Sequence, residues 1–189
     1  MLQTSSHLNE AVGSWLIRAV FLQVITAAKD AGVLRTLDDS ARPVFAVGDH
    51  ALLPTRTIKP VGLPLSAFPT LVVHVAARHK AWPDVLERTR EWMAASTTVQ
   101  AAAGVVVRGK ATRQVVWLTR LASGQVAEQL VDFHDASPSK PCDVSLPLAA
   151  LYAGVKLPPA LEGHADVPIK LDLAELLAYI EKLERQSAD

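Results

Sequence analysis

The residues best suited to chemistry in this sequence are its histidines, and their spacing argues against a preassembled metal site. His74 lies inside an apolar run between Val73 and Val75, and His79 follows five residues later. Two ligands on one element need the spacing of HExxH or a similar pair, which does not occur. We therefore predict that His74 is a buried imidazole with hydrogen-bond partners, and the alternative is a residue that lines a cleft. The six histidines are His7, His50, His74, His79, His134 and His164.

Other chemical motifs are absent or plain. The basic run Arg78-His79-Lys80 is typical of solvated surface, and contact with a phosphate or acidic partner is the alternative. The glycines never form GxGxxG or GxxxxGKS, and no GxSxG elbow occurs. The single cysteine, Cys142, excludes an intramolecular disulfide and a cysteine-based zinc site, and we interpret it as an unreactive thiol.

The composition indicates an intracellular globular protein that binds nucleic acid weakly or not at all. Half of the 189 residues are apolar, and 19 Lys+Arg balance 19 Asp+Glu to zero net charge. Phosphate binding usually needs a basic excess, so we expect nucleic-acid binding to be weak or absent. Neutrality removes one protection against self-association, so we expect an unknown protein partner or a second copy. A single cysteine fits a reducing compartment, without saying which one.

The first predicted element is a long helix over Ser6–Ala31. Its apolar residues recur at helical spacing, Ser6 can cap the start, and Gly32 follows the end as a left-handed cap would. The most apolar stretch, Val12–Ala28, is interrupted by Arg18 and is shorter than the roughly 20 residues of a membrane span. No secretory signal pattern frames it. We interpret it as a buried core helix and expect no membrane contact.

The middle of the chain predicts short strands around a single helix. Apolar, β-branched runs bounded by Gly, Pro and Asp indicate the strands, and Pro83 marks the start of the helix. Prolines and Gly62 predict a loop from Pro54 to Pro69. The predicted elements are a hairpin over 44–53, a central strand over 70–76, a helix over 82–95 and three antiparallel strands over 99–108, 112–121 and 125–133.

The C-terminal part predicts a surface crossing followed by a helix. From Ser137 to Pro168 prolines interrupt the chain, and we expect only short ordered pieces. Asp172, with Glu175 three residues on, makes a start like a capping box for a leucine-rich helix. We therefore predict one α/β domain over residues 1–189, with its core near 6–133 and a C-terminal extension over 134–189.

One long segment resembles a known family. The stretch PTLVVHVAARHKAWPDVLERTREWM, followed by AAAGVVV, resembles the core of the PD-(D/E)XK restriction-endonuclease-like superfamily, in a divergent branch of small proteins. Upstream, LLPTRTI looks like that branch's Pro-Asp strand start, and VSLPLAALYAGVKLPP shows a weaker likeness. The resemblance implies an α/β fold with a helix, a mixed sheet and a second helix, carrying extra antiparallel strands and a C-terminal helix.

The resemblance also shows which site residues this chain lacks. Such nucleases have an Asp after the Pro, an acidic residue on the next strand and a Lys two residues beyond. Thr55, His74 and Ala76 stand at these three positions. A hydroxyl and an imidazole are poor ligands for Mg²⁺, which prefers oxygens in octahedral array. Glu10 would match the helix glutamate that serves as an extra ligand, and Lys80 could supply a displaced amine.

We therefore expect a nuclease-like domain that has lost catalysis, holds no metal or other cofactor, and acts as a structural or protein-interaction module. One alternative is an active, rearranged nuclease that uses a divalent, imidazole-tolerant metal with Asp49, His74, His79 and Lys80. Another is a small-molecule binding domain with a cleft around His74. If the resemblance holds, Thr55 and His74 lie on neighbouring strands and point into one cleft.

Overall fold

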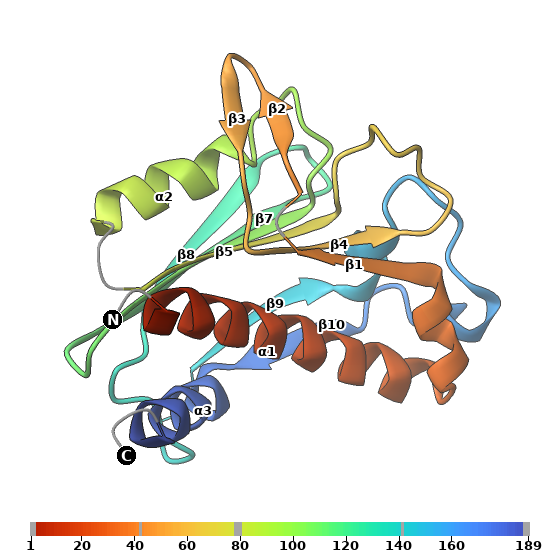
Figure 1. Cartoon of the computed structure of the whole chain (residues 1–189). Helices are drawn as coiled ribbons and strands as arrows, with labels where there is room; N and C mark the ends of the chain where they lie inside the picture. Colours follow the sequence, from red (N-terminus) through yellow and green to blue (C-terminus); the bar gives the residue numbers. More distant parts are fainter. Residues whose placement is uncertain (1–2, 42, 78–80, 141, 187–189) are drawn as a thin grey trace.

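A six-stranded mixed sheet separates two helices in the computed structural model, which describes residues 3–41, 43–77, 81–140 and 142–186. The strand order is β1-β4-β5-β6-β7-β8. One face carries α1, and the other carries α2 (Figure 1). Behind α1 in this view lies a two-stranded ribbon, β9–β10, and the C-terminal helix α3 lies below α1 (Figure 1).

Helix α1 spans Gln3–Ala28, so it begins and ends three residues before the predicted bounds. The predicted cap at Gly32 is wrong, because Lys29 takes the left-handed conformation, with φ of 53°. Asp30 then accepts a hydrogen bond from the Gly32 backbone N–H, at 2.8 Å, and starts the 3₁₀ turn η1, Ala31–Thr36. The helix ends early because this aspartate caps a new turn.

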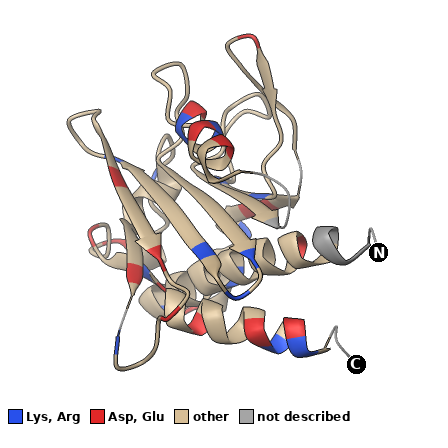
Figure 2. Ribbon diagram, turned by 90° about the vertical axis from the view of Figure 1, so that its left-hand side faces the viewer, with Lys and Arg blue, Asp and Glu red and all other residues tan. Residues whose placement is uncertain are grey.

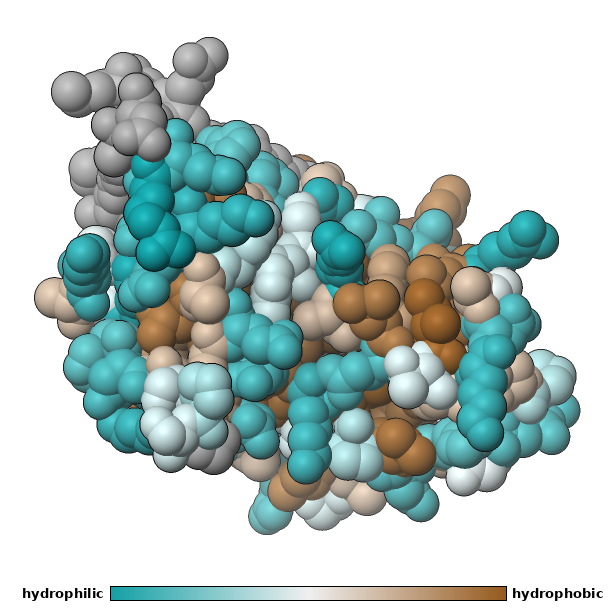
Figure 3. All heavy atoms as spheres, turned by 90° about the horizontal axis from the view of Figure 1, so that it is seen from below, coloured by the Kyte–Doolittle hydropathy of each residue, from teal (hydrophilic) through white to brown (hydrophobic). Residues whose placement is uncertain are grey.

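The outer side of α1 is mostly polar but carries one large exposed apolar residue. Val12, Leu16 and Val20 pack into the main core, while Leu22 on the outer side is 52% exposed. Seen from below, apolar side chains gather in the right half of the molecule among hydrophilic ones (Figure 3). By length and composition, His7–Ala28 could span a membrane, and 33% of that window is buried inside the molecule.

The stretch predicted as a loop between Pro54 and Pro69 contains a strand, and that prediction is wrong. Strand β4, Arg56–Pro60, pairs antiparallel with β1, Leu37–Ala41, and with β5, Leu71–Ala77. The prolines lie at or outside the ends of β4, where a missing N–H is tolerated. Strand β1 was not predicted.

The remaining central elements match their predictions. Strand β5 pairs in parallel with β6, Ala101–Arg108, through the crossover helix α2, Trp82–Glu91, which is shorter than expected. The hairpin is confirmed as β2, Phe45–Val47, with β3, His50–Leu52. The antiparallel meander continues from β6 through β7, Thr112–Arg120, to β8, Val126–Asp132.

Residues 137–168 do more than cross the surface, which corrects the prediction for this segment. Strand β9, Asp143–Pro147, pairs antiparallel with β10, Pro168–Asp172, and both alternate exposed and buried residues. The 3₁₀ turns η2, Leu148–Tyr152, and η3, Pro159–Leu161, add further core side chains. Prolines lie at the ends or starts of these short elements, as Pro147 ends β9, Pro159 begins η3 and Pro168 begins β10. Apolar residues of the same elements are buried in the main core.

Helix α3, Leu173–Gln186, begins as predicted and is tied to the sheet by a buried cation. The Asp172 carboxylate accepts from the Ala174 backbone N–H at 2.8 Å, which caps the helix. Arg113 on β7 is 1% exposed, and its Nη1 and Nη2 donate to Glu181 at 3.2 Å and Glu184 at 2.7 Å. The ion pairs join two elements far apart in sequence.

The predicted fold class is confirmed. The chain is mixed α/β, with a helix, a mixed six-stranded sheet, a second helix, extra antiparallel strands and a C-terminal helix. Side chains of the C-terminal ribbon and of α3 share one buried cluster with the sheet and α1.

We expect Arg113→Met to lower the free energy of unfolding by about 2 kcal/mol, because it leaves two carboxylates without their shared cation. Chemical denaturation of both proteins measures the difference. The matched control is Lys110→Met. Lys110 lies in the turn between β6 and β7, is exposed, and lines a hollow with the same two glutamates of α3. The control should change stability by less than about 0.5 kcal/mol. Equal effects of the two changes would contradict a specific role for Arg113.

Glycine is required where α2 crosses β6. A Cβ added to Gly104 would lie 2.2 Å from Thr89 Oγ1 and 2.7 Å from Val116 Cγ1. Gly104→Ala should therefore cost about 1–3 kcal/mol of stability through overpacking. Combining it with Thr89→Ala removes the nearest atom, so the double variant should lose less than the sum of the single changes. Additive losses in thermal or urea unfolding would mean that the helix does not press on this glycine.

Candidate functional site

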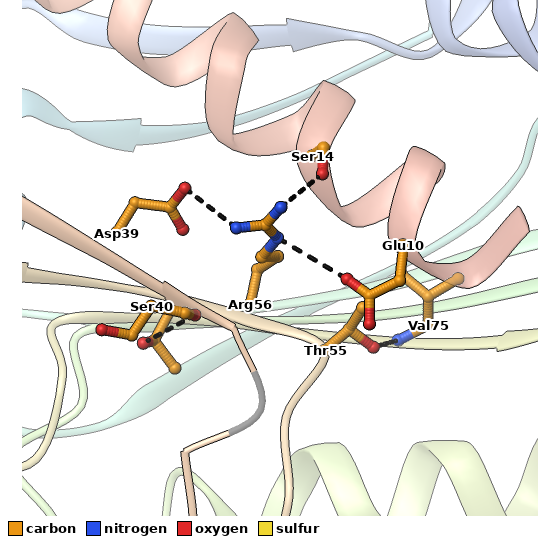
Figure 4. Close-up of polar contacts among 8 residues, drawn as sticks. Glu10, Ser14, Asp39, Ser40, Thr55, Arg56 and Val75 are labelled. Atoms are coloured by element: carbon orange, nitrogen blue, oxygen red, sulfur yellow. Dashed lines mark hydrogen bonds and ion pairs between the residues drawn. The ribbon is translucent and has the colours of Figure 1, made fainter. Parts of the chain in front are cut away.

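A polar site that joins α1, β1 and β4 surrounds Arg56, at the start of β4 (Figure 4). Its Nη2 donates to Ser14 Oγ at 2.8 Å, and its Nη1 donates to Asp39 Oδ2 at 3.2 Å. Its Nε lies 3.8 Å from Glu10 Oε2. The Arg56 side chain is 23% exposed, so these contacts form at the edge of the core under partial cover.

Helical and strand periodicity bring these residues together. Glu10 and Ser14 are four residues apart and share one face of α1. In the β1–β4 pair Arg56 lies opposite Ala41, so Asp39 is its diagonal neighbour on the same face of the sheet. Sequence reasoning singled out Glu10 but missed Asp39 and Arg56. The sequence feature that could have pointed to Arg56 is its position directly after Thr55. The surrounding prolines had led us to predict a loop there instead of a strand.

The carboxyl of Asp39 is affected by two opposing influences. Burial raises its pKa above the usual value, and the neighbouring Arg56 charge and hydrogen bond act in the opposite direction. Burial is the larger effect, so the pKa of Asp39 is raised overall. The arginine therefore offsets only part of the penalty of holding this carboxylate under the helix.

Thr55 has a structural task at the point where β4 begins. Thr55 is 8% exposed, and its Oγ1 accepts a hydrogen bond from the Val75 backbone N–H at 2.9 Å. Its own N–H donates to the Val73 carbonyl at 2.8 Å. A Cβ added to Gly13 of α1 would lie 2.9 Å from the Thr55 methyl carbon. Thr55 thus lies against α1 and extends the β4–β5 ladder.

His74 lies on the other face of the sheet. Val73 and Val75 belong to the core cluster of α1, whereas Ala76 packs with Val85 of α2, so alternation along β5 turns His74 toward α2. His74 is 7% exposed, as expected for a buried imidazole, and offers a ligand little surface. The expected cleft shared by Thr55 and His74 is therefore not formed, because the two side chains lie on opposite faces.

The other candidate residues are dispersed. Asp49 lies exposed in the turn of the β2–β3 hairpin, which projects beside α2 (Figure 1). His79 and Lys80 lie outside the described residues. Burial and the neighbouring Asp143 raise the pKa of the Cys142 thiol, so it is a poor nucleophile at neutral pH. In the part of the chain that the structure describes, no three His, Cys, Asp or Glu side chains group closely enough to hold a metal ion.

Two surface hollows lie away from the Arg56 site. A groove of about 380 Å³ runs along the polar face of α2, where His50 Nδ1 lies 3.8 Å from Glu91 Oε1. A second hollow, of about 310 Å³, is lined by Tyr152 and Thr36, whose hydroxyls are 3.0 Å apart, by Arg35 and Lys156, and by apolar residues. Either could admit a small molecule, but neither contains an assembled set of reactive groups.

Comparison with known proteins gives little. No protein-family model and no curated protein sequence matches the chain. Among solved structures, it is similar to the crystal structure of a "putative nuclease belonging to DUF820" from Anabaena variabilis ATCC 29413. The TM-score is 0.46 at 10% identity, over 86% of this chain and 80% of that one.

Replacing Arg56 by Met should expose the electrostatic balance of the site. Without the guanidinium, we expect the protein to lose about 1–2 kcal/mol at neutral pH, less than for a fully buried pair because the site is partly exposed. Burial raises the pKa of the Asp39 carboxyl in the folded state. Protonation of this carboxyl therefore favours the folded state below the pKa of the unfolded chain, and this stabilisation is lost as the pH rises through the folded-state pKa. The variant's deficit should therefore shrink as pH falls toward the usual pKa of Asp39, 3.8. Urea unfolding across this range measures it, and a pH-independent deficit would contradict the assignment.

Proposed function

We propose that the chain is a divergent PD-(D/E)XK-like domain that has lost metal-dependent cleavage and acts as a structural or protein-interaction module. The observation that carries this proposal is the position of Arg56 between Glu10 and Asp39. Its guanidinium supplies positive charge beside both carboxylates. A second cation brought to the same carboxylates would be repelled by the arginine at close range.

The residues at the resembling positions support the same conclusion. Thr55 Oγ1 already accepts a backbone hydrogen bond, and His74 is turned to the opposite face of the sheet. Mg²⁺ catalysis needs oxygen ligands that converge on one point and an ion that activates water or stabilises developing charge. Neither Thr55 nor His74 supplies a carboxylate, and the two do not face one another.

The charge distribution supports a protein partner over a nucleic acid. Acidic and basic residues alternate along α2 and α3 (Figure 2), and the net charge is zero. A duplex attracts proteins through its phosphates, which requires basic residues that are not neutralised by neighbouring acids. We propose weak, salt-sensitive binding to nucleic acid at most, with a protein partner or a second copy as the working interaction, inside the cell.

One alternative has an observation in its favour. Asp49 adjoins His50, which lies near Glu91 of α2, and His74 faces α2 from the sheet. An active, rearranged nuclease would therefore assemble its metal site on the α2 side, away from Arg56. His79 and Lys80, which follow β5, belong to the same proposal.

Incubation with single- and double-stranded DNA and RNA in Mg²⁺ or Mn²⁺ separates the two proposals. We expect no cleavage above buffer, and no rise in melting temperature when either ion is added, because bound metal would stabilise the folded state. Cleavage that His74→Ala abolishes, but that Arg56→Met leaves intact, would support the active alternative. Such a result would overturn the leading proposal.

A further inference from the structure

The last strand of the sheet, β8, leaves its outer edge open. Among the described residues it pairs only with β7, and Figure 2 shows it at the left-hand edge of the sheet. Six of its seven residues are exposed, including Leu130 at 55% and Val126 at 39%. Natural edge strands are often blunted by Pro, by a bulge or by charged side chains, especially Lys, because an open edge can pair with another chain. The segment VAEQLVD contains neither Lys nor Pro, and its charged residues are the acidic Glu128 and Asp132.

The β7 ladder determines which backbone groups of β8 face outward. The Phe133 N–H donates to the Arg113 carbonyl at 2.8 Å, and Leu121 N–H donates to the Gln125 carbonyl at 2.8 Å. Odd-numbered residues of β8 therefore bond to β7, since antiparallel pairs alternate. The N–H and C=O groups of the four even-numbered residues point away from the sheet. These are Val126, Glu128, Leu130 and Asp132.

We propose that a second copy of this chain occupies this edge, with the two β8 strands antiparallel around a twofold axis at Gln129. The pairing joins two six-stranded sheets into one. It deepens the proposed function and rests on its interaction role, because it names the partner. A twofold contact of this kind closes on itself and adds no further copies.

The charges of β8 select this register. Outward residues must face outward residues, so the axis lies at a residue and not between two. The three axes nearest the middle of β8, which pair the most residues, lie at Glu128, Gln129 and Leu130. An axis at Glu128 would set two glutamates opposite each other. An axis at Leu130 would set Glu128 opposite Asp132. Only the axis at Gln129 avoids like charges, which destabilise directly opposed pairs. Zero net charge leaves no overall repulsion between the copies.

The same register covers exposed apolar surface. Val126, Glu128 and Leu130 lie on the α2 face, because Leu130 is opposite Val116 and Glu128 reaches Arg90. With the axis at Gln129, Leu130 of one copy lies opposite Glu128 of the other and diagonal to the other Leu130. Diagonal neighbours lie within reach of long side chains, so the two leucines cover each other. Glu128 keeps its bidentate bonds to Arg90, at 2.6 and 2.8 Å.

Mass in solution and site-directed cross-linking test the proposal. We expect the full chain to sediment as a dimer. In a Cys142→Ser background, Gln129→Cys should form a covalent dimer on mild oxidation, because residues opposed at the axis in a non-hydrogen-bonded pair lie about 4.5 Å apart between Cα atoms. The matched control is Ala127→Cys, which faces Val131 of the other copy and should cross-link at least tenfold less.

A pair of charge variants tests the register independently. Leu130→Glu puts a like charge opposite Glu128 and should give a monomer, whereas Leu130→Lys puts an opposite charge there and should stay dimeric. Both lose the same exposed leucine, and circular dichroism should show both folded. A monomeric parent chain, equal cross-linking at 127 and 129, or equal behaviour of the two charge variants would overturn the inference. A monomer without nuclease activity would contradict the dimer but not the proposed loss of cleavage. A dimer that cleaves DNA would contradict the loss of cleavage but not the dimer.

Discussion

The parallel pair β5–β6 is covered by side chains on both faces, and the rest of the structure is arranged around that requirement. Seven consecutive residues of β6, from Ala101 to Val107, are buried. The side chains of a strand point alternately to the two faces of the sheet. When both sets are apolar, each face must be covered, and here α1 covers one face and α2 the other. Small residues on β6 let α2 approach the sheet closely. The approach is closest at Gly104, where an added Cβ would lie 2.2 Å from Thr89 Oγ1 of α2. The crossover helix and α1 thereby define the two layers.

The α1 layer then determines what the Arg56 site can do. Gly13 lets the helix approach Thr55, which brings Glu10 and Ser14 over the start of β4. A carboxylate at the edge of this interface needs a counter-charge, and Arg56 provides it from the adjacent strand. The arrangement resembles a binding site in having converging charged groups from three elements. Its one cation faces two carboxylates and a hydroxyl, and these contacts join α1 to β1 and β4, which fits a role in holding α1 on the sheet.

The C-terminal ribbon and α3 complete the α1 side, while the far edge of the sheet stays open. Arg113 reaches from β7 to two glutamates of α3, and Gln129 reaches from β8 to the backbone carbonyl of Asp143 on β9. These contacts cover the lower face of β7 and support β8 from one side. They leave the outward backbone groups of β8 unused within the sheet, and for this reason we propose β8 as the place where a second copy pairs.

The sequence by itself determined the elements whose signal is local. The periodicity of α1 and α3, the cap at Asp172, the Gly-Asp turn of the hairpin and the β-branched runs of β5 to β8 each depend on residues within about one element's length. The mixed α/β class followed from their order. The resemblance added only an expectation, that Thr55, His74 and Ala76 stand where a metal-dependent nuclease has its acidic residues and its lysine.

Only the tertiary structure decided which side chains meet. Strand β4 was concealed by prolines, because a proline at a strand end looks locally like a proline in a loop. The hydrogen-bond partners Ser14 of Arg56 and Glu184 of Arg113 lie 42 and 71 residues away, beyond the reach of any local pattern. The separation of Thr55 from His74 depends on which face of the sheet each side chain occupies. That is a property of strand register, and strand register is set by packing against α1 and α2.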